Sequence, residues 1–314
     1  MISYRCPSRW FRLSESDLES RRGRRPALQS ATVRVGTLNI HDTQGGSGPP
    51  ALFIHGLGSS GYMEWRFTLP HFVRTHHVYA PDLPGFGRSD KPRTARYGIP
   101  LFAKTIDRYL AARKIKSAPV IGTSMGGRIA LEMALRYPSR VSKLVIVNAL
   151  GLGRPKIQPY YPLMLVPRLG EGVLHGMKHA LNWAPGHLIR RVAARYMGAA
   201  GNLHQTLGDD YLSDLREMHM SDGYADAYVA TVRSFAVPSF FFGSMDVSGE
   251  LSKIKVPVLI IWGANDPLFP LEQAMRAHAA IPGSSLVIIE GAGHTPQAER
   301  PEEFNRHLAA FLKS

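Results

Sequence analysis

A serine stands in this chain where it could act as a nucleophile. Ser124 is the centre of Gly122-Thr123-Ser124-Met125-Gly126, which follows a short apolar run and precedes a helical pattern. A strand, a tight turn and a helix around Gly-x-Ser-x-Gly expose the serine hydroxyl, and the two glycines keep side chains from crowding it. The sequence therefore predicts that Ser124 attacks an electrophilic carbon.

The predicted nucleophile needs a base, because a serine hydroxyl keeps its proton near neutral pH. His294 follows Gly293 directly after the last apolar run of the chain. We expect its loop to emerge at the carboxyl edge of the sheet, where the serine turn also opens. None of the other twelve histidines has this placement. We therefore predict that His294 is the base.

The base in turn needs an anionic partner, which fixes the histidine tautomer and stabilises the imidazolium. Asp266 lies in the turn 263–267, between nucleophile and base in chain order and 28 residues before His294. Asp246 is the alternative, but it precedes the apolar run 258–262. Asn148 ends the preceding run and cannot supply a charge. Asp266 is therefore the predicted acid.

A glycine-rich loop follows the apolar run 51–54, with the sequence His55-Gly56-Leu57-Gly58. Backbone N–H groups in such a loop can stabilise the negative charge of a tetrahedral intermediate. We predict that the N–H groups of Leu57 and Met125 form this oxyanion hole. His55 is expected to shape the loop and to take no part in proton transfer.

The elements that must position these residues alternate along the chain. Short apolar runs end in Gly, Asp or Asn, and helical patterns at 101–114, 126–137, 271–280 and 302–312 separate several of them. This alternation predicts an α/β fold, with a mostly parallel central sheet and helices on both faces. The runs expected to be buried central strands are 51–54, 78–80, 119–121, 144–147, 258–262 and 286–289.

The alternation stops between residues 151 and 250, where helical patterns dominate. We expect this segment to be a helical cap inserted into a core of residues 31–150 and 251–314. Its large apolar side chains, among them Met177, Trp183 and residues 240–242, favour an apolar roof over a pocket. Residues 1–30 are rich in arginine and are expected to form a basic extension.

The composition limits the classes of partner. The formal net charge is +14, but the basic residues are scattered and match no nucleic-acid-binding motif, so we expect no nucleic-acid partner. Weak contact with an anionic membrane surface stays open. Cys6 is the only cysteine, which makes a reducing cytoplasm the expected location, and no apolar run is long enough to span a bilayer. No residues have the spacing of a metal site, so we expect no metal and no cofactor.

From about residue 31 to the end, these motifs resemble the α/β-hydrolase superfamily. The segment 82–90, with the sequence DLPGFGRSD, is similar to the family's turn after its next strand. The resemblance to bacterial lipases, esterases and monoacylglycerol-lipase-like enzymes implies an esterase that takes an apolar acyl substrate. Epoxide hydrolases and haloalkane dehalogenases have an aspartate as the nucleophile, whereas this chain has Ser124 at that position, so we do not expect either of these activities.

Two other functions stay open within this superfamily. Hydrolases that cleave carbon–carbon bonds of vinylogous diketones share the three catalytic residue types. They typically have Gly-Pro-Gly in the oxyanion loop and tryptophan after the catalytic histidine, where this chain has Ser59, Ser60 and Thr295. A ligand-binding member with little turnover is the other alternative.

Overall fold

The computed structural model describes residues 27–156, 161–196, 198, 203, 207–236 and 245–314. Most of the predicted basic extension, residues 1–26, lies outside this part of the chain, as do the cap residues 240–242. The first strand begins at Gln29, two residues before the predicted start of the core.

A single sheet of eight strands forms the centre of the described structure, in the order β1-β2-β4-β3-β5-β6-β7-β8. The first two strands pair antiparallel with each other, and β2 pairs antiparallel with β4. All pairs from β4 to β8 are parallel. The bounds are β1 Gln29–Val35, β2 Leu38–Gly45, β3 Pro50–Ile54, β4 His77–Pro81, β5 Ala118–Thr123, β6 Val141–Val147, β7 Val258–Gly263 and β8 Ser285–Ile289.

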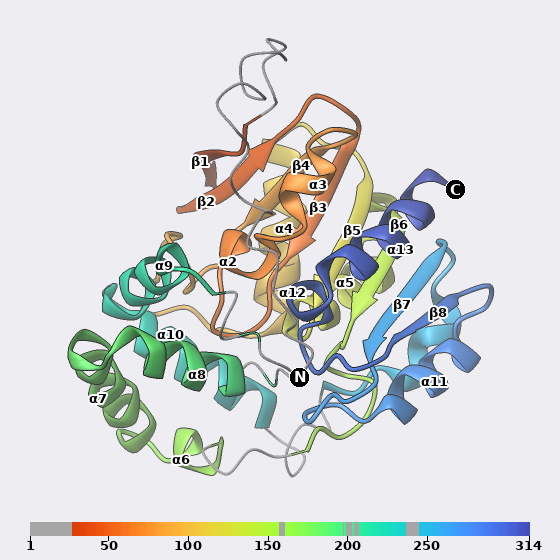
Figure 1. Ribbon diagram of the computed structural model, residues 1–314. Coiled ribbons are helices and arrows are strands. Elements are labelled where there is room, and N and C mark those ends of the chain that lie inside the picture. Colours follow the sequence, from red (N-terminus) through yellow and green to blue (C-terminus); the bar gives the residue numbers. More distant parts are fainter. Residues whose placement is uncertain (1–26, 157–160, 197, 199–202, 204–206, 237–244) are drawn as a thin grey trace, which may run out of the picture.

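Helices cover both faces of this sheet (Figure 1). On one face α4 (Ile99–Ala112), α5 (Met125–Arg136) and α11 (Leu271–Ala280) pack against side chains such as Leu52, Val120 and Ile260. On the other face α2 (Gly61–Trp65), α3 (Leu69–Phe72) and α13 (Pro301–Lys313) pack against Phe53 and Ile121. Because strand side chains alternate between faces, one strand can serve both cores. The predicted α/β architecture is confirmed.

Five α-helices lie between β6 and β7 in the described part of the chain, and we call them the inserted helices. They are α6 (Tyr161–Leu165), α7 (Leu169–Trp183), α8 (Gly186–Tyr196), α9 (Asp209–Met220) and α10 (Tyr224–Ala236). Figure 1 shows them together at one side of the sheet. Arg88 of the core holds α9 through two hydrogen bonds to the Glu217 carboxylate, of 2.7 and 2.6 Å.

Two predictions about the strands differ from the structure. The run 286–289 was expected to be a buried central strand, but β8 is the edge strand of the sheet, and Ile288 is 37% exposed. The runs expected to be strands also omitted β1 and β2. These two strands lack long apolar runs, because β2 buries polar side chains, including Asp42, that bond to distant residues such as Arg113.

Candidate active site

Ser124 occupies a strained turn between β5 and α5. Its φ of 54° and ψ of −118° lie outside the regions that L-residues prefer. A Cβ on Gly122 would lie 2.2 Å from the carbonyl oxygen of Gly126, and one on Gly126 would lie 2.3 Å from that of Ile54. Both positions therefore require glycine. The backbone N–H of Ser124 donates to Val147 of β6 at 2.9 Å, which fixes the turn to the sheet.

His294 pairs with Asp266 at the carboxyl edge of the sheet. Nδ1 of the histidine lies 2.9 Å from Oδ2 of the aspartate, and both side chains are buried. Oδ1 of Asp266 accepts hydrogen bonds from the backbone N–H groups of Leu268 at 2.7 Å and Phe269 at 3.1 Å. Because Nδ1 donates to the carboxylate, Nε2 of neutral His294 is left as an acceptor.

The surroundings shift the pKa values of this pair in opposite directions. Burial disfavours the imidazolium, but the charge and hydrogen bond of Asp266, with the charges of Glu64 and Glu299, raise the pKa of His294 above its usual value. Burial also disfavours the carboxylate of Asp266. His294, the Asn148 amide and the Leu268 N–H outweigh that cost and lower the pKa of Asp266. The pair therefore favours its charged form.

Asn148 orients the carboxylate, which the sequence did not reveal. Its Nδ2 donates to Oδ2 of Asp266, and its Oδ1 accepts from the N–H of Gly263 at 3.1 Å. It follows Val147, which accepts the backbone bond from Ser124. Asn148 thus links the serine turn to the acid loop. Its place at the end of β6 was visible in the sequence, but its partners were not.

The histidine loop and the serine turn meet through Gln297, three residues after His294. Nε2 of Gln297 contacts Oγ1 of Thr123 at 3.5 Å and donates to Oε1 of Glu64 at 2.8 Å. Within the described residues, no hydrogen bond joins the Ser124 hydroxyl to His294. Catalytic hydrogen bonds are often long in structures without substrate and tighten in the complex.

The predicted oxyanion loop lies against the serine turn. A Cβ on Gly56 would lie 3.3 Å from Cβ of Ser124. The backbone N–H of Gly56 donates to Oε2 of Glu64 at 3.2 Å. No described residue accepts a hydrogen bond from the N–H of Leu57 or Met125. Glu64 is a second residue of the site that the sequence analysis did not identify. The only sign of its role in the sequence is its position a few residues after the glycine-rich loop.

His55 is buried and connects two loops. Its Nδ1 donates to the carbonyl oxygen of Gly56 at 2.7 Å, and its Nε2 accepts from the N–H of Leu83 at 2.9 Å. Both ring nitrogens are therefore engaged by the backbone. This arrangement fits the expected loop-shaping role.

Asp246, the alternative acid, lies apart from this pair. It is exposed, and its Oδ1 accepts from the N–H of Ser248 at 2.8 Å. Among the described contacts, the carboxylate bound to His294 is that of Asp266. The inserted segment contacts the backbone of the histidine loop, because the carbonyl oxygen of Gly198 accepts a hydrogen bond from the backbone N–H of His294 at 3.0 Å.

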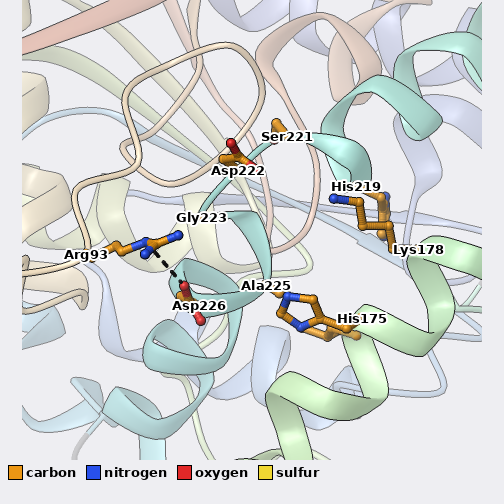
Figure 2. Close-up of a pocket in the computed structure, with 10 residues that line it drawn as sticks. Arg93, His175, Lys178, His219, Ser221, Asp222, Gly223, Ala225 and Asp226 are labelled. Atoms are coloured by element: carbon orange, nitrogen blue, oxygen red, sulfur yellow. Dashed lines mark ion pairs between the residues drawn. The ribbon is translucent and has the colours of Figure 1, made fainter.

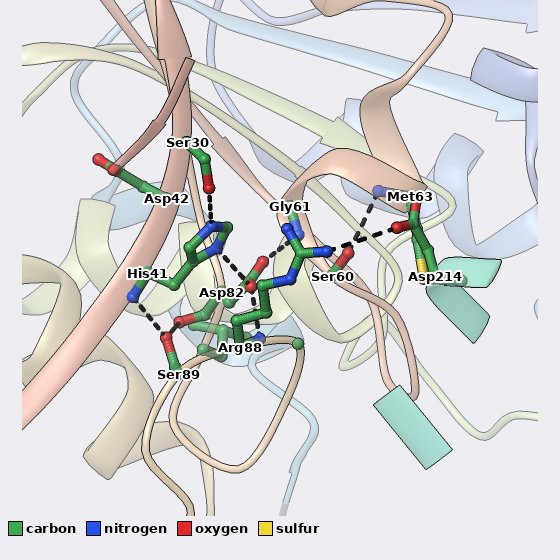
Figure 3. Close-up of polar contacts among 12 residues, drawn as sticks. Ser30, His41, Asp42, Ser60, Gly61, Met63, Asp82, Arg88, Ser89 and Asp214 are labelled. Carbon is green, nitrogen blue, oxygen red and sulfur yellow. Dashed lines mark hydrogen bonds and ion pairs between the residues drawn. The ribbon is translucent and has the colours of Figure 1, made fainter. Parts of the chain in front are cut away.

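A second histidine–aspartate pair lies in the core, at the antiparallel end of the sheet (Figure 3). Nδ1 of His41 lies 2.9 Å from Oδ2 of Asp82, and its Nε2 hydrogen-bonds the hydroxyl of Ser30. Asp82 also accepts the N–H groups of Gly61 and Arg88, both at 2.8 Å. Burial disfavours its charge, but the hydrogen bond from His41 and neighbouring groups lower its pKa.

A small polar pocket opens between α7, the start of α10 and the loop of Arg93 (Figure 2). His175, Lys178 and His219 contribute to its wall, and Arg93 forms an ion pair of 3.8 Å with Asp226 beside it. None of Ser124, Asp266 and His294 lines this pocket. It is therefore separate from the candidate active site.

The described residues contain no cluster of three or more His, Cys, Asp or Glu side chains arranged to hold a metal ion. In the same part of the chain, no helix combines the length and apolar character needed to cross a membrane.

The fold agrees with comparisons against known proteins. The model of the alpha/beta hydrolase family matches residues 51–307, so the chain belongs to that family. An uncharacterised hydrolase of Bacillus subtilis, YugF, is 30% identical over 263 residues, which cover 83% of this chain and 88% of the relative. The chain is thus a hydrolase-family member whose particular reaction has to be argued from its site.

Two further relatives have more specific names. The 2-hydroxymuconate semialdehyde hydrolase of a Pseudomonas species is 26% identical over 280 residues, covering 87% of this chain and 89% of that protein. The solved structure of a bacterial membrane phospholipase A is 27% identical with a TM-score of 0.70, and the match covers 91% of this chain and 86% of that one. Solved structures of a meta-cleavage product hydrolase and of a putative lipase, 24% and 23% identical to this chain with TM-scores of 0.70 and 0.71, share its fold.

Proposed function

We propose that this protein hydrolyses carboxylic esters through an acyl-enzyme intermediate on Ser124. Oγ of Ser124 attacks the carbonyl carbon while Nε2 of His294 takes the hydroxyl proton. The carbon–oxygen bond then breaks, and the alcohol leaves with that proton. Water, activated by the same nitrogen, attacks the acyl carbon and releases the acid and the serine.

The observation that carries this proposal is the orientation of His294. Because Nδ1 donates to Asp266, Nε2 is the nitrogen that can accept a proton, and the same loop reaches the serine turn through Gln297. The strained backbone of Ser124 supports the assignment, since strain of this kind is concentrated at functional sites. Glu64 and Asn148 act in this proposal as positioning residues.

The N–H groups of Leu57 and Met125 are the proposed oxyanion donors. Met125 is the first residue of α5, so its N–H has no intrahelical acceptor and points out of the positive end of the helix. Losing one such donor typically costs about 3 kcal/mol of transition-state stabilisation.

We propose the inserted segment 151–250 as a cap over an apolar acyl group. Tyr228 of α10 approaches the oxyanion loop, since a Cβ on Gly58 would lie 3.1 Å from its ring. Val232 and Phe235 continue the buried face of the same helix. The likeness to a solved structure named as a membrane phospholipase A supports a substrate of this class.

Carbon–carbon bond hydrolysis is the second candidate, favoured by the relative named 2-hydroxymuconate semialdehyde hydrolase. The same serine, histidine and aspartate could serve that reaction. Against it stand Ser59 and Ser60 in the oxyanion loop and Thr295 after the histidine, where such enzymes typically have proline, glycine and tryptophan.

A substrate comparison separates the two candidates. Nitrophenyl esters of graded acyl length and 2-hydroxymuconate semialdehyde are each assayed with the wild type, Ser124→Ala and the matched control Ser30→Ala. We expect ester turnover by the wild type and the control, and its loss in Ser124→Ala. Turnover of the semialdehyde with negligible ester turnover would favour the second candidate. Unchanged turnover in Ser124→Ala would refute the first candidate if the substrate is the ester, and the second if it is the semialdehyde.

A further inference from the structure

Large apolar side chains are exposed mainly on the inserted helices. Ten such residues are at least 37% exposed in the described structure, and eight of them lie between positions 163 and 220. Trp183 is 88% exposed, although the sequence suggested that the aromatic residues of this segment would roof a pocket. Concentrated exposed apolar groups of this kind mark an interaction surface.

Helix α8 presents a mixed face to the solvent. Leu188, Arg191, Val192 and Arg195 are spaced as i, i+3, i+4 and i+7, which places them on one side of the helix, and all four are exposed. Leu188 is 46% exposed and Val192 is 55% exposed. The opposite side is buried through Ile189 and Ala194. The outer face of α8 therefore combines aliphatic groups with arginines.

Helix α7, which precedes α8 in the chain, also exposes apolar side chains. Leu169 and Trp183, at its two ends, are 45% and 88% exposed, and a Cβ on Gly172 or Gly176 between them would meet nothing within 4 Å. Only two residues separate Trp183 from the start of α8 at Gly186. Figure 1 shows α6 and α7 at the outer edge of the inserted helices. We call the exposed faces of α7 and α8 the outer face.

The charged residues of this segment are mostly basic. Between residues 161 and 196 the chain has five lysines and arginines and one acid, Glu171. That acid is already bound by Arg233 at 2.6 Å. Arg191 and Arg195 are exposed, and none of the ion pairs among described residues includes them. The outer face is thus apolar and positively charged.

We propose that the outer face docks on an anionic lipid surface. Its aliphatic groups and Trp183 would enter the interface, while Arg191 and Arg195 would meet the anionic headgroups. The basic N-terminal segment and a second copy of this face fit less well, because each would bring like charges together. This inference goes beyond the proposed esterase function and does not depend on the chemistry of Ser124.

Vesicle binding tests the proposal. The full chain is sedimented with vesicles of phosphatidylcholine alone or with phosphatidylglycerol added. In a Trp10→Phe background, we expect binding to the anionic vesicles and a blue shift of tryptophan emission that Trp183→Phe removes. Trp65 and Trp262 are fully buried in the described structure, so they should not report the interface. Equal binding to both vesicle types, or no binding, would overturn the proposal.

A matched pair of variants separates this face from net charge. Arg191→Glu with Arg195→Glu should lower the fraction bound at least about tenfold. Arg276→Glu with Arg306→Glu changes the net charge by the same amount, at exposed positions of α11 and α13. This control pair should change the fraction bound less than about twofold. Equal losses in the two variants would contradict the proposal. Thermal unfolding checks that both variants are folded, and vesicle binding by Ser124→Ala separates docking from hydrolysis.

Sedimentation velocity without lipid tests whether a second copy of this chain binds the outer face instead. We expect no change in oligomeric state between the wild type and Arg191→Glu with Arg195→Glu. A wild-type oligomer that these substitutions dissociate would assign the outer face to a second copy and contradict lipid docking.

Discussion

His294 and His41 each place Nδ1 2.9 Å from Oδ2 of a buried aspartate, Asp266 in one case and Asp82 in the other. In both pairs the aspartate also accepts hydrogen bonds from backbone N–H groups of neighbouring loops. The two histidine–carboxylate units are therefore nearly equivalent as local geometry.

The serines beside them are not equivalent. Ser30 already hydrogen-bonds His41, but it lies in the regular strand β1, and its side chain is on the exposed edge of the sheet. Ser124 stands at φ 54° before the first turn of α5, next to a glycine-rich loop. The proposed oxyanion donors, the N–H groups of Leu57 and Met125, belong to the loop and helix beside Ser124.

This contrast teaches that a serine–histidine–aspartate connection does not by itself make a reactive hydroxyl. The backbone of the nucleophile and the groups that receive the developing charge decide the outcome. In our account the Asp266 pair serves catalysis, and the Asp82 pair holds the start of α2 at Gly61 and the loop that carries Arg88. Substitutions in the two pairs should therefore affect different measurements.

The largest expected effect is that of Ser124→Ala. The variant lacks the attacking oxygen, so kcat/KM for nitrophenyl esters should fall about 10⁴-fold or more, with unchanged stability to urea. Steady-state kinetics measure the first quantity and urea unfolding the second. A variant that keeps more than a tenth of the wild-type activity would contradict the assignment.

Asp266→Asn should come next, with kcat reduced about 10³- to 10⁴-fold. The amide can donate to Nδ1, which favours the wrong tautomer and leaves Nε2 protonated. The charge that raises the pKa of His294 is also lost. His41→Gln, the control in the second pair, should keep kcat within about threefold. Similar kcat values for both variants would erase the distinction between the pairs.

The pH profile of ester hydrolysis should show the raised pKa of His294. Catalysis requires the neutral imidazole, so activity is lost as pH falls through the folded-state pKa, which lies above 6.5. At pH 5.5, kcat/KM should therefore be roughly a tenth of its plateau value or less. A profile that stays flat down to pH 5.5 would exclude His294 as the base.

His41→Ala should affect stability more than activity. It leaves the buried carboxylate of Asp82 without its strongest side-chain partner, which should cost about 1–3 kcal/mol in the free energy of unfolding. The pKa of Asp82 is lowered, so its contribution is present above the unfolded value near 3.8 and is lost as pH falls through the folded value. Urea unfolding at pH 7 and at about pH 3 measures this, and a stability equal to wild type at pH 7 would be the contrary result.

The smallest effect is expected for Ser30→Ala. Ser30 is exposed, and its hydroxyl can be replaced by water as a partner of His41. Ester kcat/KM should stay within about twofold, and the free energy of unfolding should change by less than about 0.5 kcal/mol. A large loss of activity in this variant would assign a catalytic part to the second pair.

Much of the sheet could be predicted from the sequence, because β3, β5, β6 and β7 are buried on both faces and are therefore continuous apolar runs. The serine turn could be predicted because its glycines are required by contacts within a few residues. The two antiparallel strands β1 and β2 could not, since they lack long apolar runs and Asp42 of β2 is held by a polar contact with Arg113, 71 residues away.

The candidate site was predictable only in part, for the same reason. Ser124, Asp266 and His294 follow strands at one edge of the sheet, and chain order placed them together. The support from Asn148 depends on a partner 118 residues away. The link between Gln297 and Glu64 spans 233 residues. Neither of these contacts produces a pattern that can be recognised in the neighbouring sequence. Trp183 likewise resembled a core residue, because its exposure depends on the packing of α7.

Labelling with a fluorophosphonate probe, followed by peptide mapping, tests the central contrast most directly, because the probe phosphonylates an activated serine hydroxyl. Our account predicts that the label is found on the peptide of Ser124, is absent from that of Ser30, and is lost in Ser124→Ala. Label on Ser30, or an unlabelled Ser124 in folded protein, would contradict it.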